Sequence, residues 1–217
     1  MAYELLIFDF DGTLVDTAPD IATHANTTLV KYRFPRKSLS EVKRAIGQGV
    51  HELLKDLGFR GEEDTLDEAV EFFKKEYFRR PVIRTAPYPH VRRHLGGVLK
   101  GLSKAIVTNK PQKLTEQILS ELGLRHFFDA VIGEGGRFPR KPDPASVEFV
   151  MKKLKSVPGR TAFVGDSRVD HQTAKGAGID FIHVSYGYDF SFRPRSKRSL
   201  ESAREWSEIL TVKKGQR

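Results

Sequence analysis

The chain has 217 residues, of which 39% are hydrophobic and 30% charged, a composition typical of a soluble globular protein with one core and room for an insertion. The absence of cysteine excludes disulfides, thiolate zinc sites and cysteine nucleophiles. No apolar run approaches the roughly 18 residues that a membrane span needs, and the N-terminus does not resemble a signal peptide, so we expect a cytoplasmic protein with no membrane partner.

Five short apolar segments predict buried strands. The first, "YELLIFDF" at residues 3–10, ends just before a glycine, as a buried strand of a parallel sheet commonly does. Helical patterns lie between the later segments, for example at 111–123, where proline stands at the start and glycine at the end. This alternation predicts an α/β fold, a Rossmann-like parallel sheet with helices on both faces. The four later strands are expected at residues 104–109, 127–133, 160–166 and 178–187.

Residues 17–84 break this alternation. Four amphipathic patterns follow one another with no strand between them, which predicts a small all-helical domain inserted after the first strand. The segment "PVIRTAPYP" at 81–89 is expected to lead the chain back. The predicted core domain therefore comprises residues 1–16 and 85–217, and the insertion comprises 17–84.

Polar side chains stand where the predicted strands end. The carboxyl ends of parallel strands meet at one edge of a sheet, so groups that are remote in sequence are expected to gather there. The clusters are "DFDGT" with Asp9 and Asp11 after the first strand, Thr108–Asn109 after the second, Lys141 of "RKPDP" in the loop after the third, and "GDSRVD" with Asp166 and Asp170 after the fourth.

These clusters together resemble a known family. "DFDGTLVDT", "VTNK", "KPDP" and "VGDSRVDHQTAKGAG" occur in the order and with the approximate spacing of the four motifs of the haloacid dehalogenase superfamily. Taken singly, each is more typical of a turn, a helix cap or a solvated loop. Four such coincidences at one sheet edge favour function, and the resemblance extends over about residues 3–188.

The resemblance implies three catalytic residues. Asp9 is expected to attack phosphorus and form an aspartyl-phosphate, which divides one difficult hydrolysis into two easier steps. Asp11, two residues further along an extended segment, would protonate the leaving oxygen and then activate water. Lys141 would neutralise the nucleophile and the transferring group. A carboxylate in the place of Asp11 argues against dehalogenation and for phosphoryl transfer.

Several carboxylates and a phosphate in one pocket repel one another, so a divalent cation is expected. The family uses Mg²⁺, which prefers oxygen ligands. The implied ligands are the side chains of Asp9 and Asp166 and the main-chain carbonyl of Asp11, with Asp170 in support. The phosphate is expected to accept hydrogen bonds from the backbone near Gly12 and from Thr108 and Asn109.

Within the family, "DGTLVDTAPDI", "IGQGV", "APYPHV" and "VTNKP" resemble phosphoglycolate phosphatases. The insertion then resembles a cap that closes over small phosphate esters. Gly47 and Gln48 in this cap are candidate substrate-binding residues, although "IGQG" alone is typical of a helix–helix turn. Pro89–His90 departs from the proline-glycine usual at that hinge, and both a monomer and a homodimer stay open.

Other functions use the same machinery. The alternatives are a sugar-phosphate phosphatase, a pyrophosphatase or a β-phosphoglucomutase-like mutase, although the basic cap segment of the mutases is not found. A different alternative is a nucleic-acid or acidic-partner binding module, because residues 193–217 carry more than half of the net charge of +9. The pattern at 199–210 favours a final amphipathic helix, docked through Leu200, Trp206 and Leu210, and a solvated charged surface rather than a nucleic-acid partner.

Overall fold

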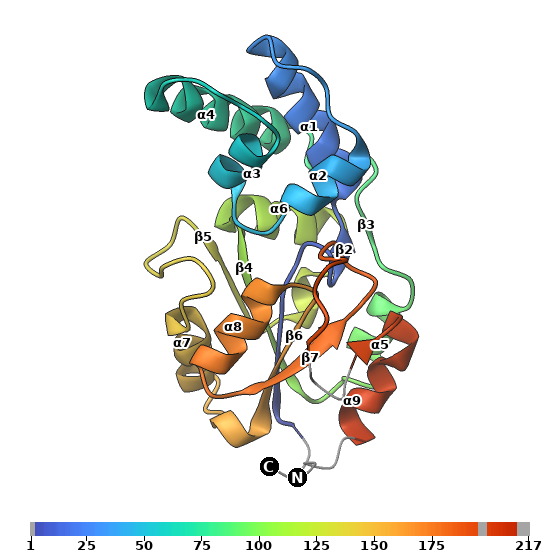
Figure 1. Ribbon diagram of the computed structural model, residues 1–217. Helices are drawn as coiled ribbons and strands as arrows, with labels where there is room; N and C mark the ends of the chain where they lie inside the picture. The colour runs from blue at the N-terminus through green and yellow to red at the C-terminus, as the bar shows by residue number, and fades with distance from the viewer. Residues whose placement is uncertain (1–2, 195–198, 212–217) are drawn as a thin grey trace.

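The computed structural model describes residues 3–194 and 199–211. Of residues 210 and 211 it describes the main chain only. Within these residues, six parallel strands form one sheet in the order β5-β4-β1-β6-β7-β8 (Figure 1). The predicted α/β class and all five predicted strands are confirmed. The strands are β1 (Leu5–Phe8), β4 (Ser103–Pro111), β5 (Ala130–Glu134), β6 (Thr161–Gly165), β7 (Asp180–Val184) and β8 (Ser199–Leu200).

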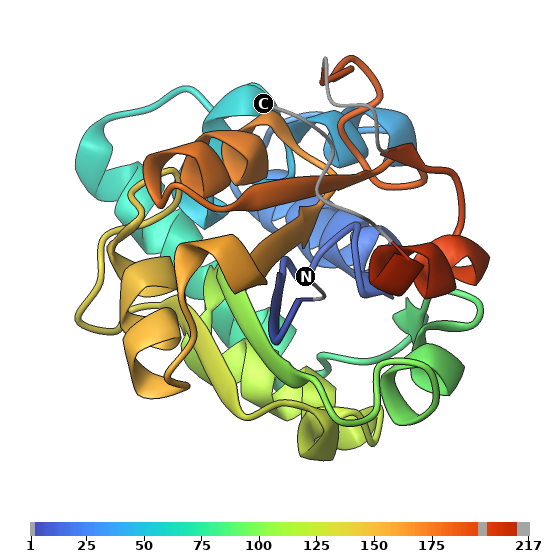
Figure 2. The same ribbon diagram turned by 90° about the horizontal axis from the view of Figure 1, so that it is seen from below.

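Strand β1 lies in the middle of the sheet and is buried on both faces. Its side chains alternate: Leu6 and Phe8 pack into one hydrophobic core, and Leu5 and Ile7 pack into the other. Helices α7 and α8 cover one face, and α5, α6 and α9 cover the other (Figure 2). The prediction of helices on both faces is confirmed. These helices are α5 (Val91–Gly96), α6 (Gln112–Glu121), α7 (Ala145–Lys153), α8 (Arg168–Gly176) and α9 (Glu208–Thr211), with short 3₁₀ turns η1 (Arg125–Phe127), η2 (Pro158–Arg160) and η3 (Ala203–Ser207).

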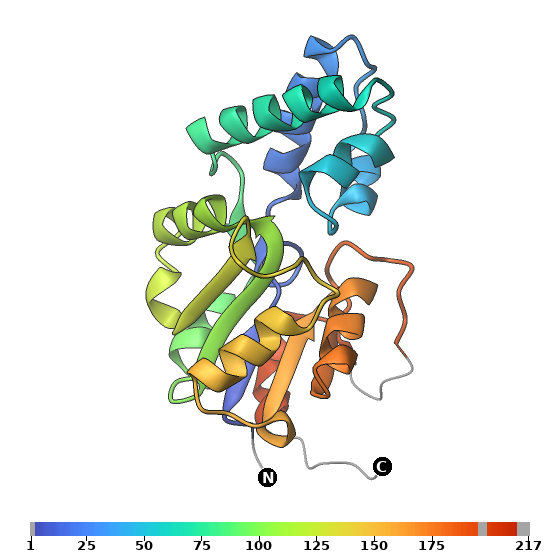
Figure 3. The ribbon, with the colours of Figure 1, turned by 90° about the vertical axis from the view of Figure 1, so that its left-hand side faces the viewer.

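Residues 18–79, all of them described, form only helices and the turns between them, as expected. Their apolar faces pack together, with Leu29, Val42, Leu54 and Phe73 among the buried side chains. The group stands beyond the carboxyl ends of the strands (Figure 3). The helices are α1 (Ala18–Lys31), α2 (Leu39–Ala45), α3 (Val50–Asp56) and α4 (Glu63–Arg79).

A small second sheet, which the sequence did not predict, joins the helical group to the large sheet. Strand β2 (Val15–Asp16) pairs antiparallel with β3 (Ala86–Pro87), so the outgoing and returning chain run side by side. Further along, His90 adopts a left-handed backbone conformation with φ 72° at the start of α5. Glycine adopts this conformation without strain, which explains the glycine usual at this hinge.

The prediction of one helix over 199–210 is wrong. Ser199–Leu200 form β8, because their main chain pairs with β7, and helical turns begin only at Ala203. Leu200 and Trp206 are buried, as expected, whereas the side chain of Leu210 lies outside the described residues. So do residues 195–198 and 212–217, which carry most of the basic tail, and the nucleic-acid alternative therefore stays untested. Among the described helices, none has the length and apolar character needed to cross a membrane.

Candidate active site

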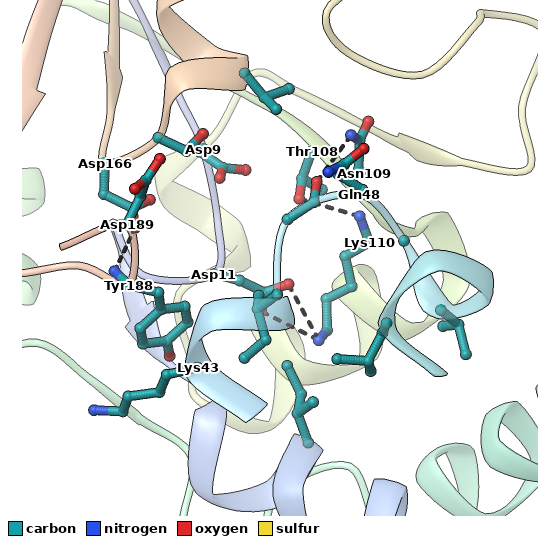
Figure 4. A pocket seen from close by; sticks show the side chains of 18 of the residues that line it. Asp9, Asp11, Lys43, Gln48, Thr108, Asn109, Lys110, Asp166, Tyr188 and Asp189 are labelled. Atoms are coloured by element: carbon teal, nitrogen blue, oxygen red, sulfur yellow. Dashed lines mark hydrogen bonds and ion pairs between the residues drawn. The ribbon is translucent and has the colours of Figure 1, made fainter. Parts of the chain in front are cut away.

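Three buried aspartates meet at the carboxyl ends of β1 and β6. Asp9 follows β1, Asp166 follows β6, and Asp170 lies in the first turn of α8. One carboxylate oxygen from each lies within 4.8 Å of the others, and Figure 4 shows Asp9 and Asp166 together at one end of a pocket. The edge of the parallel sheet therefore brings together acidic residues that are more than 150 positions apart in the sequence.

Lys141 enters this cluster from the loop after β5. Its Nζ atom lies 2.8 Å from Asp9 Oδ1 and 2.6 Å from Asp170 Oδ1. The Asn109 side chain fixes the Lys141 main chain: Lys141 N donates to Asn109 Oδ1 at 2.8 Å, and Asn109 Nδ2 donates to Lys141 O at 3.1 Å. Asn109 thus positions the predicted catalytic lysine from β4.

Asp170 is held by the start of α8. Ser167 is the N-cap, and its N–H and hydroxyl both donate to Asp170 Oδ2, at 3.1 and 2.7 Å. Since Lys141 binds Oδ1, both oxygens of Asp170 have donors. Asp166 is also fixed, because its Oδ1 accepts from Thr13 Oγ1 at 3.2 Å and its Oδ2 from Tyr188 N at 2.6 Å.

The crowded carboxylates change one another's protonation. Burial, and then the Asp170 charge, raise the pKa of Asp9 to about 7, although Lys141 opposes the shift. Burial and the charges of Asp170 and Asp9 raise the pKa of Asp166 well above its ordinary value. Burial alone would lower the pKa of Lys141, but the Asp170 and Asp9 carboxylates outweigh it and the pKa is raised. The cluster therefore holds more negative charge than its one ammonium can balance.

The donors that are present fit a divalent cation. The buried Asp9 Oδ1 atom has the ammonium of Lys141 at 2.8 Å, and this one ammonium also serves Asp170. A set of carboxylate oxygens without thiolate or imidazole is the donor type that Mg²⁺ prefers. Gly12 allows the main chain after Asp11 to lie close to the Asp166 carboxylate. Its φ is 81°, and a Cβ there would lie 2.6 Å from Asp166 Oδ2.

Asp11 lies outside this cluster. Its Oδ1 accepts from Lys110 Nζ at 3.1 Å and from Thr17 Oγ1 at 2.5 Å, and Figure 4 shows the side chain turned toward Lys110. Lys110 also contacts the Tyr77 hydroxyl of α4 at 3.1 Å. Sequence reasoning quoted Lys110 within "VTNK" but gave it no role; a lysine directly after two polar residues at a strand end was the available signal.

Four of the predicted phosphate- and substrate-binding residues, Thr108, Asn109, Gly47 and Gln48, line one pocket, whereas Gly12 does not line it. Thr108 is buried in the pocket wall, where its hydroxyl oxygen accepts from Lys110 N. Both residues of the Thr108–Asn109 pair lie inside β4, so they do not cap α6.

Asn109 Nδ2 donates also to Gly47 O at 3.0 Å, which ties β4 to the turn before α3. Next to Gly47, the carbonyl of Gln48 accepts from Arg140 Nη1 at 3.3 Å. Because Asn109 Nδ2 already donates to both Lys141 O and Gly47 O, a phosphate could accept from it only if one of these two hydrogen bonds broke.

The pocket has a volume of about 720 Å³ and lies between the carboxylate cluster and the helical group. The helical group contributes apolar side chains to its wall, among them Ile21, Val50, Leu53 and Phe73. Its cationic side chains are those of Lys43, Arg44, Lys110 and Arg168. The sequence analysis gave no role to Lys43, Lys110 or Arg168.

A family model described as "Haloacid dehalogenase-like hydrolase" matches residues 6–184. The chain belongs to this family. It is 37% identical over 193 residues to a phosphoglycolate phosphatase of Pseudomonas syringae pv. syringae, covering 86% of this chain and 71% of the relative. It is 34% identical to a phosphoglycolate phosphatase of Aquifex aeolicus, covering 85% of each. The crystal structure of a predicted phosphoglycolate phosphatase from Haemophilus somnus superposes with a TM-score of 0.87 at 28% identity, covering 95% of this chain and 97% of that one.

These similarities confirm the predicted family and the prediction of a hydrolase related to phosphoglycolate phosphatases. They do not bear on the individual roles of Asp9, Asp11, Lys141 and the other site residues. Those roles stay predictions, now with defined geometry.

Proposed function

We propose that the chain is a magnesium-dependent phosphatase that hydrolyses 2-phosphoglycolate through an aspartyl-phosphate at Asp9. The observation that carries this proposal is the buried cluster of Asp9, Asp166 and Asp170, in which three carboxylates face the single ammonium of Lys141. Membership of the hydrolase family and the names of two relatives support the same activity.

Asp9, Asp166 and Asp170 would hold the Mg²⁺ ion, with the Asp11 carbonyl as a further ligand. The ion would offset the carboxylate charges and polarise the phosphoryl oxygens. Asp9 then forms a bond to phosphorus while the bond from phosphorus to the leaving oxygen breaks, and Asp11 gives that oxygen its proton. Asp11 next takes a proton from water, which attacks phosphorus and releases Asp9. Lys141, 2.8 Å from Asp9, stabilises the negative charge on the nucleophile and on the transferring phosphoryl group.

We propose that residues 17–84 act as a cap over this site, and that residues 1–16 and 85–217 form the core domain. The turn at Gly47 and Gln48 supports this, because Asn109 and Arg140 of the core bind its carbonyls beside the pocket. A closed cap would exclude water from the phosphoryl transfer. Only a small phosphate ester fits such a closed space, which is why we expect no macromolecular substrate.

One observation favours a second candidate, a larger phosphate ester. Phosphoglycolate is small and carries two anionic groups, whereas the pocket has about 720 Å³ and an apolar wall. Lys43 and Arg168 at the pocket suit the carboxylate of phosphoglycolate, but Ile21, Leu53 and Phe73 suit a substrate with an apolar part.

A substrate panel separates the two candidates. Phosphoglycolate, several sugar phosphates, pyrophosphate and an aryl phosphate are assayed with Mg²⁺ and with EDTA. The proposal predicts that phosphoglycolate has the highest kcat/KM, by about tenfold or more, and that EDTA abolishes turnover of every substrate. Phosphoglycolate among the poorest substrates would overturn the substrate assignment, and full activity in EDTA would overturn the metal dependence.

A further inference from the structure

Lys110 is a buried lysine at the end of β4, its side chain 3% exposed. Its Nζ atom lies 3.1 and 3.4 Å from the two Asp11 oxygens and 3.1 Å from the Tyr77 hydroxyl. It therefore connects the segment after β1 with α4 of the helical group. Figure 4 shows the Asp11–Lys110 pair on the side of the pocket away from Asp9 and Asp166.

The Asp11 carboxylate is held from two sides. Thr17 Oγ1 donates to Oδ1 at 2.5 Å, and the Lys110 ammonium binds the same oxygen. A carboxylate with two strong donors has a defined direction, which matters for a group that must meet a leaving oxygen within hydrogen-bond reach. Without Lys110, Thr17 alone would allow the side chain to rotate.

The position of Lys110 depends in turn on α4. A lysine side chain is flexible and needs fixed partners to stay in one place. Tyr77 supplies them: its hydroxyl accepts from Nζ, and Nζ lies 4.6 Å from its ring centroid. Tyr77 is itself buried, and its ring stacks on His24 of α1 at 4.8 Å. The helical group thus presents a fixed aromatic residue to the lysine.

We propose that Lys110 is a positioning residue for Asp11, and that Tyr77 acts through Lys110. This inference rests on the proposed function, in which Asp11 protonates the leaving oxygen. It gives the helical group a direct part in catalysis, because α4 then orients the acid of the core without contacting the substrate.

The test uses two leaving groups. Departure of 4-nitrophenolate needs no proton, whereas departure of the alkoxide from phosphoglycolate does, so loss of acid catalysis lowers kcat/KM for phosphoglycolate selectively. We expect Asp11→Asn to lower kcat/KM for phosphoglycolate about 100-fold or more relative to 4-nitrophenyl phosphate, Lys110→Met about tenfold, and Tyr77→Phe about threefold. In the Lys110→Met background, Tyr77→Phe should have no further effect on the ratio.

Lys104→Met is the matched control. Lys104 is a buried lysine at the other end of β4, where its Nζ donates to the carbonyls of Leu99 and Leu102. Its loss should reduce stability but leave the ratio of the two kcat/KM values unchanged. If Lys110→Met does not fold, Tyr77→Phe alone decides, because it keeps the shape of the ring.

The outcomes separate the inference from the function. A selective loss in Asp11→Asn together with an equal loss for both substrates in Lys110→Met, or a Tyr77→Phe effect that adds to that of Lys110→Met, overturns the inference and leaves the function standing. An equal loss for both substrates in Asp11→Asn itself overturns the assigned role of Asp11, and with it the basis of the inference.

Discussion

Two buried carboxylates in this molecule have opposite surroundings. Asp20, at the start of α1, accepts hydrogen bonds from the main-chain N–H groups of Ile83, Arg84 and Thr85 and from the Thr85 hydroxyl. Asp9 faces two further carboxylates and shares the single ammonium of Lys141 with one of them, Asp170. Both are buried, so burial alone does not explain the difference.

The number of donors decides the pKa in each place. At Asp20, burial favours the protonated form, but the donors from residues 83–85 outweigh it and lower the pKa. At Asp9, burial and Asp170 prevail and raise the pKa to about 7. We infer that Asp20 stabilises the fold, because its hydrogen bonds join α1 to the returning chain. The Asp9 cluster instead lowers the stability of the metal-free fold, because its carboxylates repel one another.

The largest difference between the two carboxylates is expected in catalysis. Asp9→Asn keeps the shape of the side chain but removes the nucleophile, so kcat should fall at least about 10⁴-fold. Asp20→Asn should retain most of the activity per folded molecule. Steady-state kinetics with phosphoglycolate measure both, and comparable losses in the two variants would remove the distinction.

Metal binding should depend on the cluster and on pH. Asp166→Asn removes one ligand and should weaken Mg²⁺ affinity about 10- to 100-fold, measured by calorimetry. Protons compete with the ion for Asp9, whose pKa is about 7, so the apparent Kd should rise about tenfold or more between pH 8 and pH 5.5. Asp20→Asn is the control, and a Kd for Mg²⁺ that is independent of pH would speak against binding at Asp9.

Replacing Asp20, whose carboxylate is fully hydrogen-bonded, should lower the free energy of unfolding. Asp20→Asn leaves N–H groups facing an amide that can donate as well as accept, and should cost about 1–3 kcal/mol of unfolding free energy in urea at pH 7. Because the folded pKa lies below the unfolded value of about 3.9, this contribution is present above pH 3.9 and is lost as the pH falls through the folded pKa. A difference between wild type and variant that does not shrink as the pH falls below 3.9 would contradict this.

Replacing Asp9 by Asn should instead raise the free energy of unfolding of the metal-free protein. Because the folded pKa of Asp9 is raised, ionisation destabilises the metal-free protein progressively as the pH rises from about 4 to about 7. Asp9→Asn should therefore stabilise the metal-free protein at pH 8 by about 1 kcal/mol, with little difference near pH 4. Excess Mg²⁺ should reverse the order, because it stabilises the wild type more. Thermal unfolding in EDTA and in Mg²⁺ gives both comparisons.

Much of the fold could be predicted because local patterns agree with it. Buried runs such as Leu5–Phe8 and periodic segments such as Gln112–Glu121 carry their own signals. Strand β8 could not be predicted, since two residues pair with β7 only after the chain has returned to the sheet edge. The antiparallel pair β2 and β3 is equally short and joins residues about 70 positions apart.

The site divides in the same way. The positions of Asp9, Asp166 and Lys141 follow from the rule that the carboxyl ends of parallel strands share an edge. The partners of Asp11 do not follow from it, because Tyr77 reaches Lys110 through the packing of α4 against the core. Likewise, the contact of Asn109 with both Lys141 and Gly47 depends on side-chain directions that no sequence pattern specifies.

Acid-quenched wild-type protein, stopped during turnover of phosphoglycolate with Mg²⁺ and analysed by peptide mass spectrometry, tests the central claim most directly. We predict one added phosphoryl group on the peptide that contains Asp9, absent from Asp9→Asn and from samples in EDTA. Phosphate on a different residue, or turnover of the wild type with an unmodified Asp9 peptide at every quench time, would contradict the account.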